Sequence, residues 1–109
     1  MKRGELWTVA GAGDYAGKPR PALILQDDLF DRTDSVTICI TTTTDIGPAA
    51  FRVPIVPSPT NGLQMPCFLM ADKVTTVGRG KLGRRIGTAS APTLADVGRA
   101  VVVFLGLAG

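Results

Sequence analysis

Frequent glycine and proline residues restrict this chain to short structural elements. The 109 residues include 13 glycines and 8 prolines, which are scattered between short apolar stretches. Such punctuation is typical of a small all-β or mostly-β domain. The length predicts one domain, residues 1–109, and a composition with 45% hydrophobic and 19% charged residues is that of a globular protein.

The apolar stretches predict a sheet of short strands. The expected strands are Glu5–Ala10, Pro21–Leu25, Ser35–Thr44, Phe51–Val56 and Cys67–Asp72, with Val74–Val77 leading into a short basic turn, GRGKLGRR, and Ile86–Thr88 closing the sheet. Pro54 predicts that its strand lies at an edge, because proline cannot donate a ladder hydrogen bond. Between the second and third strands, Asp27 or Asp28 can cap one helical turn.

The C-terminal segment gives two conflicting signals. The three valines at 101–103 favour a strand by propensity, whereas Leu94, Val97 and the first of these valines recur at helical spacing. Ser90 stands where an N-cap is needed, so we predict a helix over Ala91–Leu107. This helix carries few charges, and one small core cannot cover all of its surface, which predicts a dimer or another partner.

Histidine is absent, and its absence excludes several kinds of chemistry. The chain cannot build a ribonuclease site with paired imidazoles, a histidine-based triad or a histidine-ligated zinc site. Cys39 and Cys67 lie far apart in apolar stretches and form no CxxC motif, so we expect two buried, reduced thiols rather than a zinc or thioredoxin-like site. Acid–base chemistry therefore falls to carboxylates, lysine, tyrosine or water, and we expect neither a metal nor a cofactor.

Charge and hydropathy set broad limits on partners and location. Twelve basic and nine acidic residues give a net charge of +3, which is compatible with a nucleic-acid partner but is not evidence for one. The N-terminus has no apolar run of signal-peptide length, and no apolar segment reaches about 18 residues. We therefore expect a cytoplasmic protein that does not cross a membrane.

One glycine-rich loop gathers residues that suit a phosphodiester. Asp14, Tyr15, Lys18 and Arg20 lie within seven residues of one another. Arg20 can neutralise a phosphate, and Asp14 can stand near the attacking hydroxyl. A solvated turn with a surface ion pair would show the same residues, and from these residues alone it is the favoured interpretation.

Hydroxyl groups gather at the end of the third expected strand. Alternation places Thr41 and Thr43 on one face, and hydroxyls at a strand end can hold a phosphate or orient a water. The β-propensity of threonine explains the same run of residues, and taken alone it is the favoured explanation.

Three weaker candidates lie further along the chain. Asp72 and Lys73 follow a buried stretch, and Phe51 begins the edge strand, where its ring can stack on a base. The basic residues, which can follow a nucleic-acid backbone or form a solvated turn, are Arg79, Lys81, Arg84 and Arg85.

Five segments in order give the chain a resemblance to a known family. They are MKRGELWTV, KPRPALIL, ICITTTTD, MADKVTTV and KLGRRIGTAS. With these segments the chain resembles, nearly end to end, the MazF/PemK family of toxin ribonucleases from toxin–antitoxin pairs, in the CcdB/MazF-like superfamily. The resemblance implies a mainly β fold: a small SH3-like, partly open β-barrel with a C-terminal α-helix, assembled as a homodimer across its sheet. It also implies sequence-specific, metal-independent cleavage of single-stranded RNA and a cognate acidic antitoxin encoded nearby.

The resemblance also implies roles for single residues. Arg20 corresponds to the family's catalytic arginine and Thr43 to its catalytic threonine. Asp14 stands where some members place a catalytic loop glutamate, which makes it the first candidate for the base, with Asp72 second. The residues expected to contact RNA are Tyr15, Lys18, Thr44, Phe51, Asp72 and Lys73.

RNA carries its own nucleophile, the 2′-hydroxyl. A metal-free enzyme must deprotonate it, neutralise the pentacoordinate phosphorane and protonate the leaving 5′-oxygen, which yields a 2′,3′-cyclic phosphate and a 5′-hydroxyl. Met70, Lys73 and Thr75 depart from the residues usual in the family, so an RNA-binding module with impaired catalysis is one alternative. A non-catalytic toxin of the same fold that binds DNA gyrase is another, but the tail Gly-Leu-Ala-Gly lacks the aromatic residue that such members use.

Overall fold

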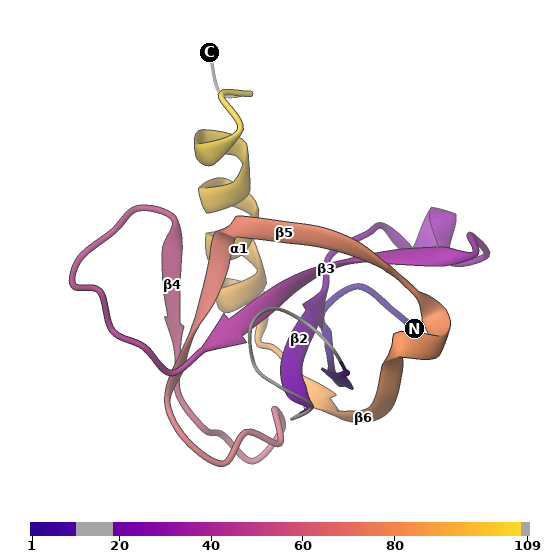
Figure 1. Cartoon of the computed structure of the whole chain (residues 1–109). Coiled ribbons are helices and arrows are strands. Elements are labelled where there is room, and N and C mark those ends of the chain that lie inside the picture. The colour runs from indigo at the N-terminus through magenta and orange to yellow at the C-terminus, as the bar shows by residue number, and fades with distance from the viewer. Residues whose placement is uncertain (11–18, 108–109) are drawn as a thin grey trace.

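Six strands, two short 3₁₀ turns and one helix make up the chain in a computed structural model that describes residues 1–10 and 19–107 (Figure 1). In chain order the elements are β1 (Glu5–Val9), β2 (Arg20–Ile24), η1 (Asp28–Phe30), β3 (Ser35–Thr42), β4 (Arg52–Ile55), β5 (Cys67–Gly78), η2 (Arg79–Lys81), β6 (Leu82–Thr88) and α1 (Ala91–Phe104). The mainly β fold with one C-terminal helix is confirmed. Asp27, rather than Asp28, caps η1 by accepting a hydrogen bond from the Leu29 N–H.

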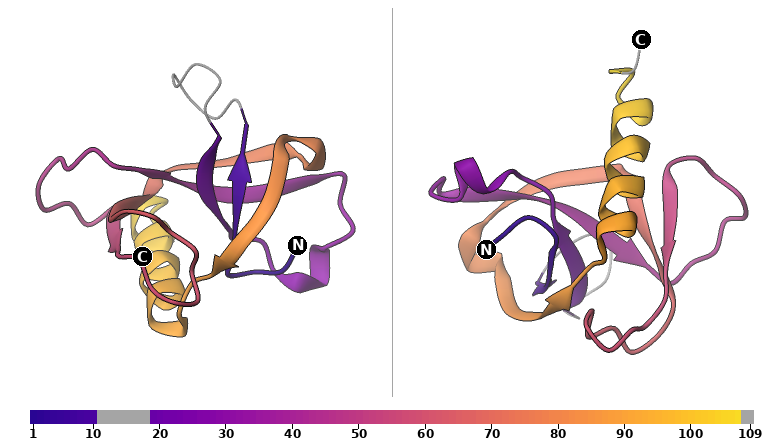
Figure 2. Two further views of the ribbon diagram at one scale, coloured as in Figure 1. Left: turned by 90° about the horizontal axis from the view of Figure 1, so that it is seen from below. Right: turned by 180° about the vertical axis from the view of Figure 1, so that it is seen from behind.

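The strands form one antiparallel sheet in the order β4-β5-β3-β2-β1-β6. The sheet bends strongly, so that β6 curves away from the plane of β3 and β5 (Figures 1 and 2). Within the described residues β4 and β6 are its two edges, which confirms the edge position expected from Pro54. These pairings establish an open, bent sheet, and its closure into an SH3-like barrel stays a prediction.

Several strand boundaries differ from the sequence prediction, and the larger differences lie in β3, β5 and β6. β3 ends at Thr42 rather than Thr44, because the Thr44 N–H donates to Thr42 Oγ1 (3.2 Å) and turns the chain out of the sheet. β5 continues through Asp72 and Lys73 to Gly78 as one strand of 12 residues.

The prediction of a basic turn over GRGKLGRR is only partly confirmed. The turn is limited to η2, and Leu82 already starts β6. Sequence reasoning could not place this boundary because two adjacent arginines after a glycine, in the exposed part of a strand, resemble a solvated loop.

Both faces of the bent sheet carry apolar side chains. Leu23 and Cys39 are fully buried in a cluster beneath α1, whereas Ala22, Ile24 and Ile38 are fully buried in a second cluster. Successive residues of β2 and β3 thus alternate between two cores, which explains why these strands read as continuous apolar runs.

Both cysteines are buried free thiols, as expected. Burial raises the pKa of the Cys39 thiol to about 12, and burial likewise raises the pKa of Cys67. Both therefore stay protonated and unreactive at neutral pH.

Helix α1 confirms the prediction from the C-terminal pattern, although it ends at Phe104 rather than Leu107. Ser90 caps it by accepting a hydrogen bond from the Thr93 N–H (3.2 Å), and Val97 and Ala100 bury its inner face. Beyond the core the helix leaves large apolar side chains exposed, namely Val102, Val103, Phe104, Leu105 and Leu107. Within residues 1–10 and 19–107 no helix is long and apolar enough to cross a membrane.

Candidate active site

Arg20 and Thr43 line the same cavity, which has a volume of about 570 Å³. Arg20 is the first residue of β2, opposite Val9 of β1, and Thr43 immediately follows β3. The two residues, 23 positions apart in sequence, reach the same cavity because β2 and β3 are neighbours in the sheet. This is the arrangement on which a shared role for the guanidinium and the hydroxyl depends.

The cavity wall at β3 is fixed by threonine hydroxyls. Thr41 is 2% exposed, and its Oγ1 donates to the Pro21 carbonyl at 2.6 Å, which ties β3 to β2 beside Arg20. Thr42 uses its hydroxyl to turn the chain, as described above. Thr43 directly follows these two residues, is exposed and lines the cavity.

Part of the cavity lining comes from a loop that a buried asparagine organises. Asn61 is 4% exposed, and its Oδ1 accepts from the N–H groups of Ser58 and Leu63, both at 3.0 Å. Gly62 has a φ of +70°, and a Cβ there would lie 1.9 Å from the Ile86 carbonyl oxygen, so only glycine lets the loop lie on β6. The same loop contributes Gln64 and Met65 to the cavity lining.

Strand β6 supplies a second arginine to the cavity. Arg84 lines it, whereas the adjacent Arg85 places its Nε 3.0 Å from Glu5 Oε2. Burial raises the pKa of Glu5, but hydrogen bonds from the Lys2 N–H and the Trp7 indole, together with the Arg85 charge, hold that pKa below its usual value. Glu5 is therefore ionised at neutral pH and pairs with Arg85.

Asp72 does not lie with Arg20 and Thr43. Both of its oxygens accept from Arg52, at 2.9 Å from Nε and 3.1 Å from Nη2, and the two side chains are only 15% and 10% exposed. The hydrogen bonds from Arg52 lower the pKa of Asp72. A carboxylate held in this way is a poor proton acceptor, and among the described residues the cavity lining contains no carboxylate.

The structure brings only some of the expected RNA contacts near the cavity. Phe51 packs on Phe104 of α1, with ring centroids 5.8 Å apart, and Arg52 lies over its ring. Thr44 directly follows Thr43 and is exposed. Lys73 is exposed on β5, but it does not line the cavity. Asp14, Tyr15 and Lys18 lie outside the described residues.

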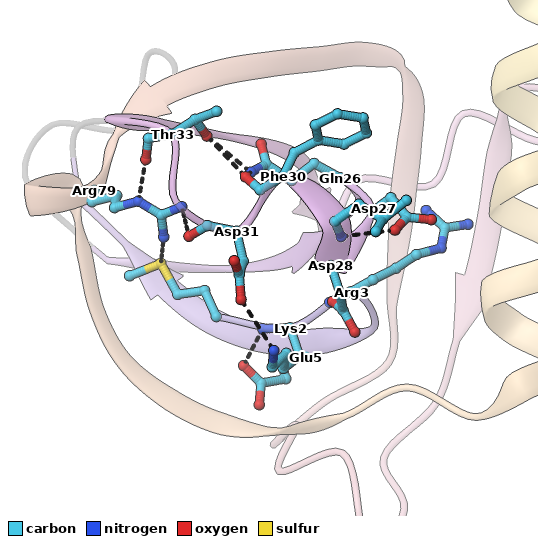
Figure 3. A network of polar contacts seen from close by, with 12 residues as sticks. Lys2, Arg3, Glu5, Gln26, Asp27, Asp28, Phe30, Asp31, Thr33 and Arg79 are labelled. Carbon is cyan, nitrogen blue, oxygen red and sulfur yellow. Dashed lines mark hydrogen bonds and ion pairs between the residues drawn. The ribbon is translucent and has the colours of Figure 1, made fainter.

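One of the basic candidates has a structural task instead. The Arg79 guanidinium donates to the carbonyls of Asp31 and Thr33 and contacts Met1 Sδ at 3.3 Å (Figure 3). Lys2 adds an ion pair to Asp31 at 3.1 Å. This network ties the N-terminus to η1 and to the turn before β6, so Arg79 is occupied within the fold.

Sequence reasoning missed part of the cavity. Arg84 stood among the basic candidates without a specific role, and Gln64, Met65 and Thr8 were not considered. The sequence did contain a signal that separates Arg84 from Arg85, because adjacent residues of a strand face opposite sides of the sheet. No local sequence pattern indicated Gln64 and Met65, because their position depends on how a loop folds back on a distant strand.

In the described part of the chain, no three side chains of histidine, cysteine, aspartate or glutamate lie together as ligands for an ion.

The fold and the cavity define a small, mainly β protein with arginines and hydroxyls around one open site. Residues 2–105 match the family model described as PemK-like, MazF-like toxin of type II toxin–antitoxin system, and the chain belongs to this family. A relative from Mycolicibacterium smegmatis, named probable endoribonuclease MazF, is 48% identical over 109 residues and covers both chains in full.

Solved structures agree with this assignment. An endoribonuclease in complex with its cognate antitoxin from Mycobacterial species superposes with a TM-score of 0.80 and 25% identity, over 98% of this chain and 96% of that one. The Mycobacterium tuberculosis toxin MazF-mt6 gives 0.79 and 27% identity, over 94% and 96%.

Proposed function

We propose that this chain is the toxin of a type II toxin–antitoxin pair and cleaves single-stranded RNA, such as mRNA in the cytoplasm, at specific sequences and without a metal ion. The observation that carries the proposal is that Arg20 and Thr43 line one cavity. Membership of the family and the endoribonuclease names of its relatives support it.

The proposed reaction starts with the 2′-hydroxyl of the RNA. A base removes its proton, the 2′-oxygen attacks the adjacent phosphorus, and the 5′-oxygen leaves with a proton, which gives a 2′,3′-cyclic phosphate and a 5′-hydroxyl end. Arg20 neutralises the charge of the phosphorane, because a guanidinium is always charged and its paired N–H groups match phosphate oxygens. Thr43 donates a hydrogen bond to the phosphate or holds the 2′-hydroxyl.

Asp14 remains the first candidate for the base. It lies outside the described residues, so its place in the reaction rests on the loop sequence and on the resemblance. Asp72 is the weaker candidate because Arg52 occupies both of its oxygens and lowers its pKa.

Purified protein is expected to cut a mixed pool of single-stranded RNA in the presence of excess EDTA. Sequencing of the new ends should find 5′-hydroxyl termini that cluster at one short sequence. Cleavage that EDTA abolishes would contradict the metal-free reaction. RNA that is bound but left intact would favour the impaired binding module, and inhibition of DNA gyrase supercoiling without RNA cleavage would favour the gyrase-binding toxin.

We also propose that the toxin is a homodimer that uses the outer surface of α1. Val103, Phe104, Leu105 and Leu107 are 59%, 48%, 57% and 71% exposed, which is a large apolar surface for a small monomer. A shallow cavity of about 720 Å³ runs beside the helix and is lined by Leu94 and Val102 among others. A second copy of the chain would remove these side chains from water.

The proposed protein partner is an acidic antitoxin encoded nearby. One similar structure is described as a complex with its cognate antitoxin. In this chain Lys73 and Arg84 are exposed basic residues, and Arg84 lines the candidate RNA cavity. An acidic antitoxin segment bound there would block RNA by occupying the same positive charges.

Light scattering after size exclusion should give twice the 11.4 kDa of one chain for the toxin alone. Val103→Asp should reduce this to one chain without unfolding it, because Val103 is exposed in the monomer. Addition of the neighbouring antitoxin should form a larger complex and stop cleavage. A monomeric wild type, or an antitoxin that binds without inhibiting, would contradict the corresponding proposal.

A further inference from the structure

Two adjacent arginines of β6 have different surroundings. The Arg85 guanidinium pairs with Glu5 at 3.0 Å, on the side of the strand away from the cavity. Arg84 lines the cavity together with Arg20 and Thr43, and it is exposed. Within residues 1–10 and 19–107, the Arg84 side chain makes no hydrogen bond or ion pair. The fold therefore places a second guanidinium at the cavity, and none of the described residues pairs with it.

A β-bulge places Arg84 there. Trp7 pairs with Arg85 and Val9 with Leu82, so two steps along β1 correspond to three along β6. The Arg84 N–H donates to Thr8 Oγ1 at 3.1 Å. Gly83 allows this approach, because a Cβ on it would lie 2.4 Å from Thr8 Oγ1. Bulges of this kind redirect side chains next to functional sites.

We infer that Arg84 binds an RNA phosphate that flanks the scissile one and so positions the strand across the cavity. This inference rests on the proposed function and extends it. Arg20 lies on β2 and Arg84 on β6, and β1 separates these two strands in the sheet. A single phosphate is satisfied by one bidentate guanidinium, whereas two arginines on separate strands fit a ligand with charges repeated along its length.

A matched pair of variants tests the inference. Arg84→Ala and Arg85→Ala remove the same charge from neighbouring residues, but only the first removes a side chain from the cavity. Binding is measured with a fluorescent single-stranded RNA of mixed sequence in which every ribose is 2′-O-methylated, so that no 2′-hydroxyl can attack. The salt dependence of the dissociation constant then counts the phosphates that the protein contacts.

Arg84→Ala should reduce the slope of log affinity against log salt by about 0.7, the value for one phosphate of a single strand. In cleavage assays it should raise KM about 5- to 10-fold and leave kcat within about threefold, because a flanking contact is made before and during the reaction alike. Arg85→Ala should match wild type in all three quantities, and Arg84→Lys should restore most of the slope.

Equal slopes for the two alanine variants would overturn the inference, as would a loss confined to kcat. Absence of RNA binding by wild type would overturn it as well. Wild type that binds the methylated RNA but cuts no natural RNA would refute the proposed function alone, since the slopes would still decide whether Arg84 contacts a phosphate.

Discussion

Arg20→Ala is expected to reduce RNA cleavage by about 100- to 1,000-fold, which is the usual effect of removing one preorganised group that stabilises a transition state. The phosphorane carries more negative charge than the phosphate from which it forms, so the guanidinium contributes more to the transition state than to binding. The loss should therefore appear in kcat, with a smaller change in the affinity for 2′-O-methylated RNA.

The fold should survive this substitution. Arg20 is the first residue of β2 and only half-buried, and the fully buried side chains of the strand are Ala22, Leu23 and Ile24. Unfolding in urea should show a free energy close to that of wild type. Arg32→Ala is the matched control, because it removes the same charge from an exposed position outside the cavity lining and should leave cleavage unchanged.

Arg20→Lys separates charge from geometry. A lysine keeps the positive charge but loses the paired N–H groups that contact two phosphate oxygens, so its activity should lie between wild type and the alanine variant. If Arg20→Ala retained cleavage within about tenfold of wild type, Arg20 could not be the group that neutralises the phosphorane.

The part of the site that lies on regular strands could be predicted from the sequence. Period-two alternation assigned Thr41 and Thr43 to one face, and both line the cavity even though Thr43 falls just beyond the end of β3. Alternation within one strand requires no knowledge of the strand order. The strand order is required to predict that Arg20, on the neighbouring strand β2, lines the same cavity as Thr43.

The sequence could not show that β5 continues as one strand through Asp72. A carboxylate and a lysine after an apolar stretch read as the end of a strand, because an isolated charge is costly to bury. Arg52 removes that cost, but it lies 20 positions away on β4, and only the register that sets Arg52 opposite Met70 brings it within reach. Long-range pairing of this kind leaves no local pattern.

The packing of Phe51 could not be predicted from the sequence for a similar reason. An aromatic residue at the start of an edge strand is a reasonable base-stacking candidate, but its surroundings depend on where α1 packs. The helix sets Phe104 against Phe51, so the ring joins the apolar contact between α1 and β4. The exposed side of that same helix end supports the proposed dimer surface.

Asp72→Ala is expected to lower the free energy of unfolding by about 2 to 3 kcal/mol. Exposed ion pairs contribute roughly 0 to 1 kcal/mol, while removing one partner of a fully buried pair costs about 3 to 5 kcal/mol. The Asp72–Arg52 pair, with side chains 15% and 10% exposed, lies between these limits but nearer the second. The Asp96–Arg99 pair on α1 has side chains 52% and 70% exposed, so Asp96→Ala serves as the control and should cost under about 1 kcal/mol.

The pH dependence of this difference follows from the direction of the pKa shift. Arg52 lowers the pKa of Asp72 in the folded protein, so the carboxylate contributes stability above its unfolded pKa, near 3.8, and loses it as the pH falls through the folded value. The stability difference between wild type and Asp72→Ala should therefore be constant from about pH 7 to 5 and shrink below about pH 4. A difference that grew on acidification would contradict the ion pair as its source.

A substitution of Asp72 also tests whether Asp72 or Asp14 is the base that removes the proton of the 2′-hydroxyl. If Asp72 removed the proton from the 2′-hydroxyl, Asp72→Asn would abolish cleavage and remove the acidic limb of the pH–rate profile. The geometry predicts the opposite result: Asn keeps an oxygen for Arg52, so the variant should stay folded at a moderate temperature and cut RNA within about tenfold of wild type with the same profile. Loss of that limb in Asp14→Asn but not in Asp72→Asn would place the base on the loop, since a structural carboxylate changes stability and leaves the titration of the rate untouched.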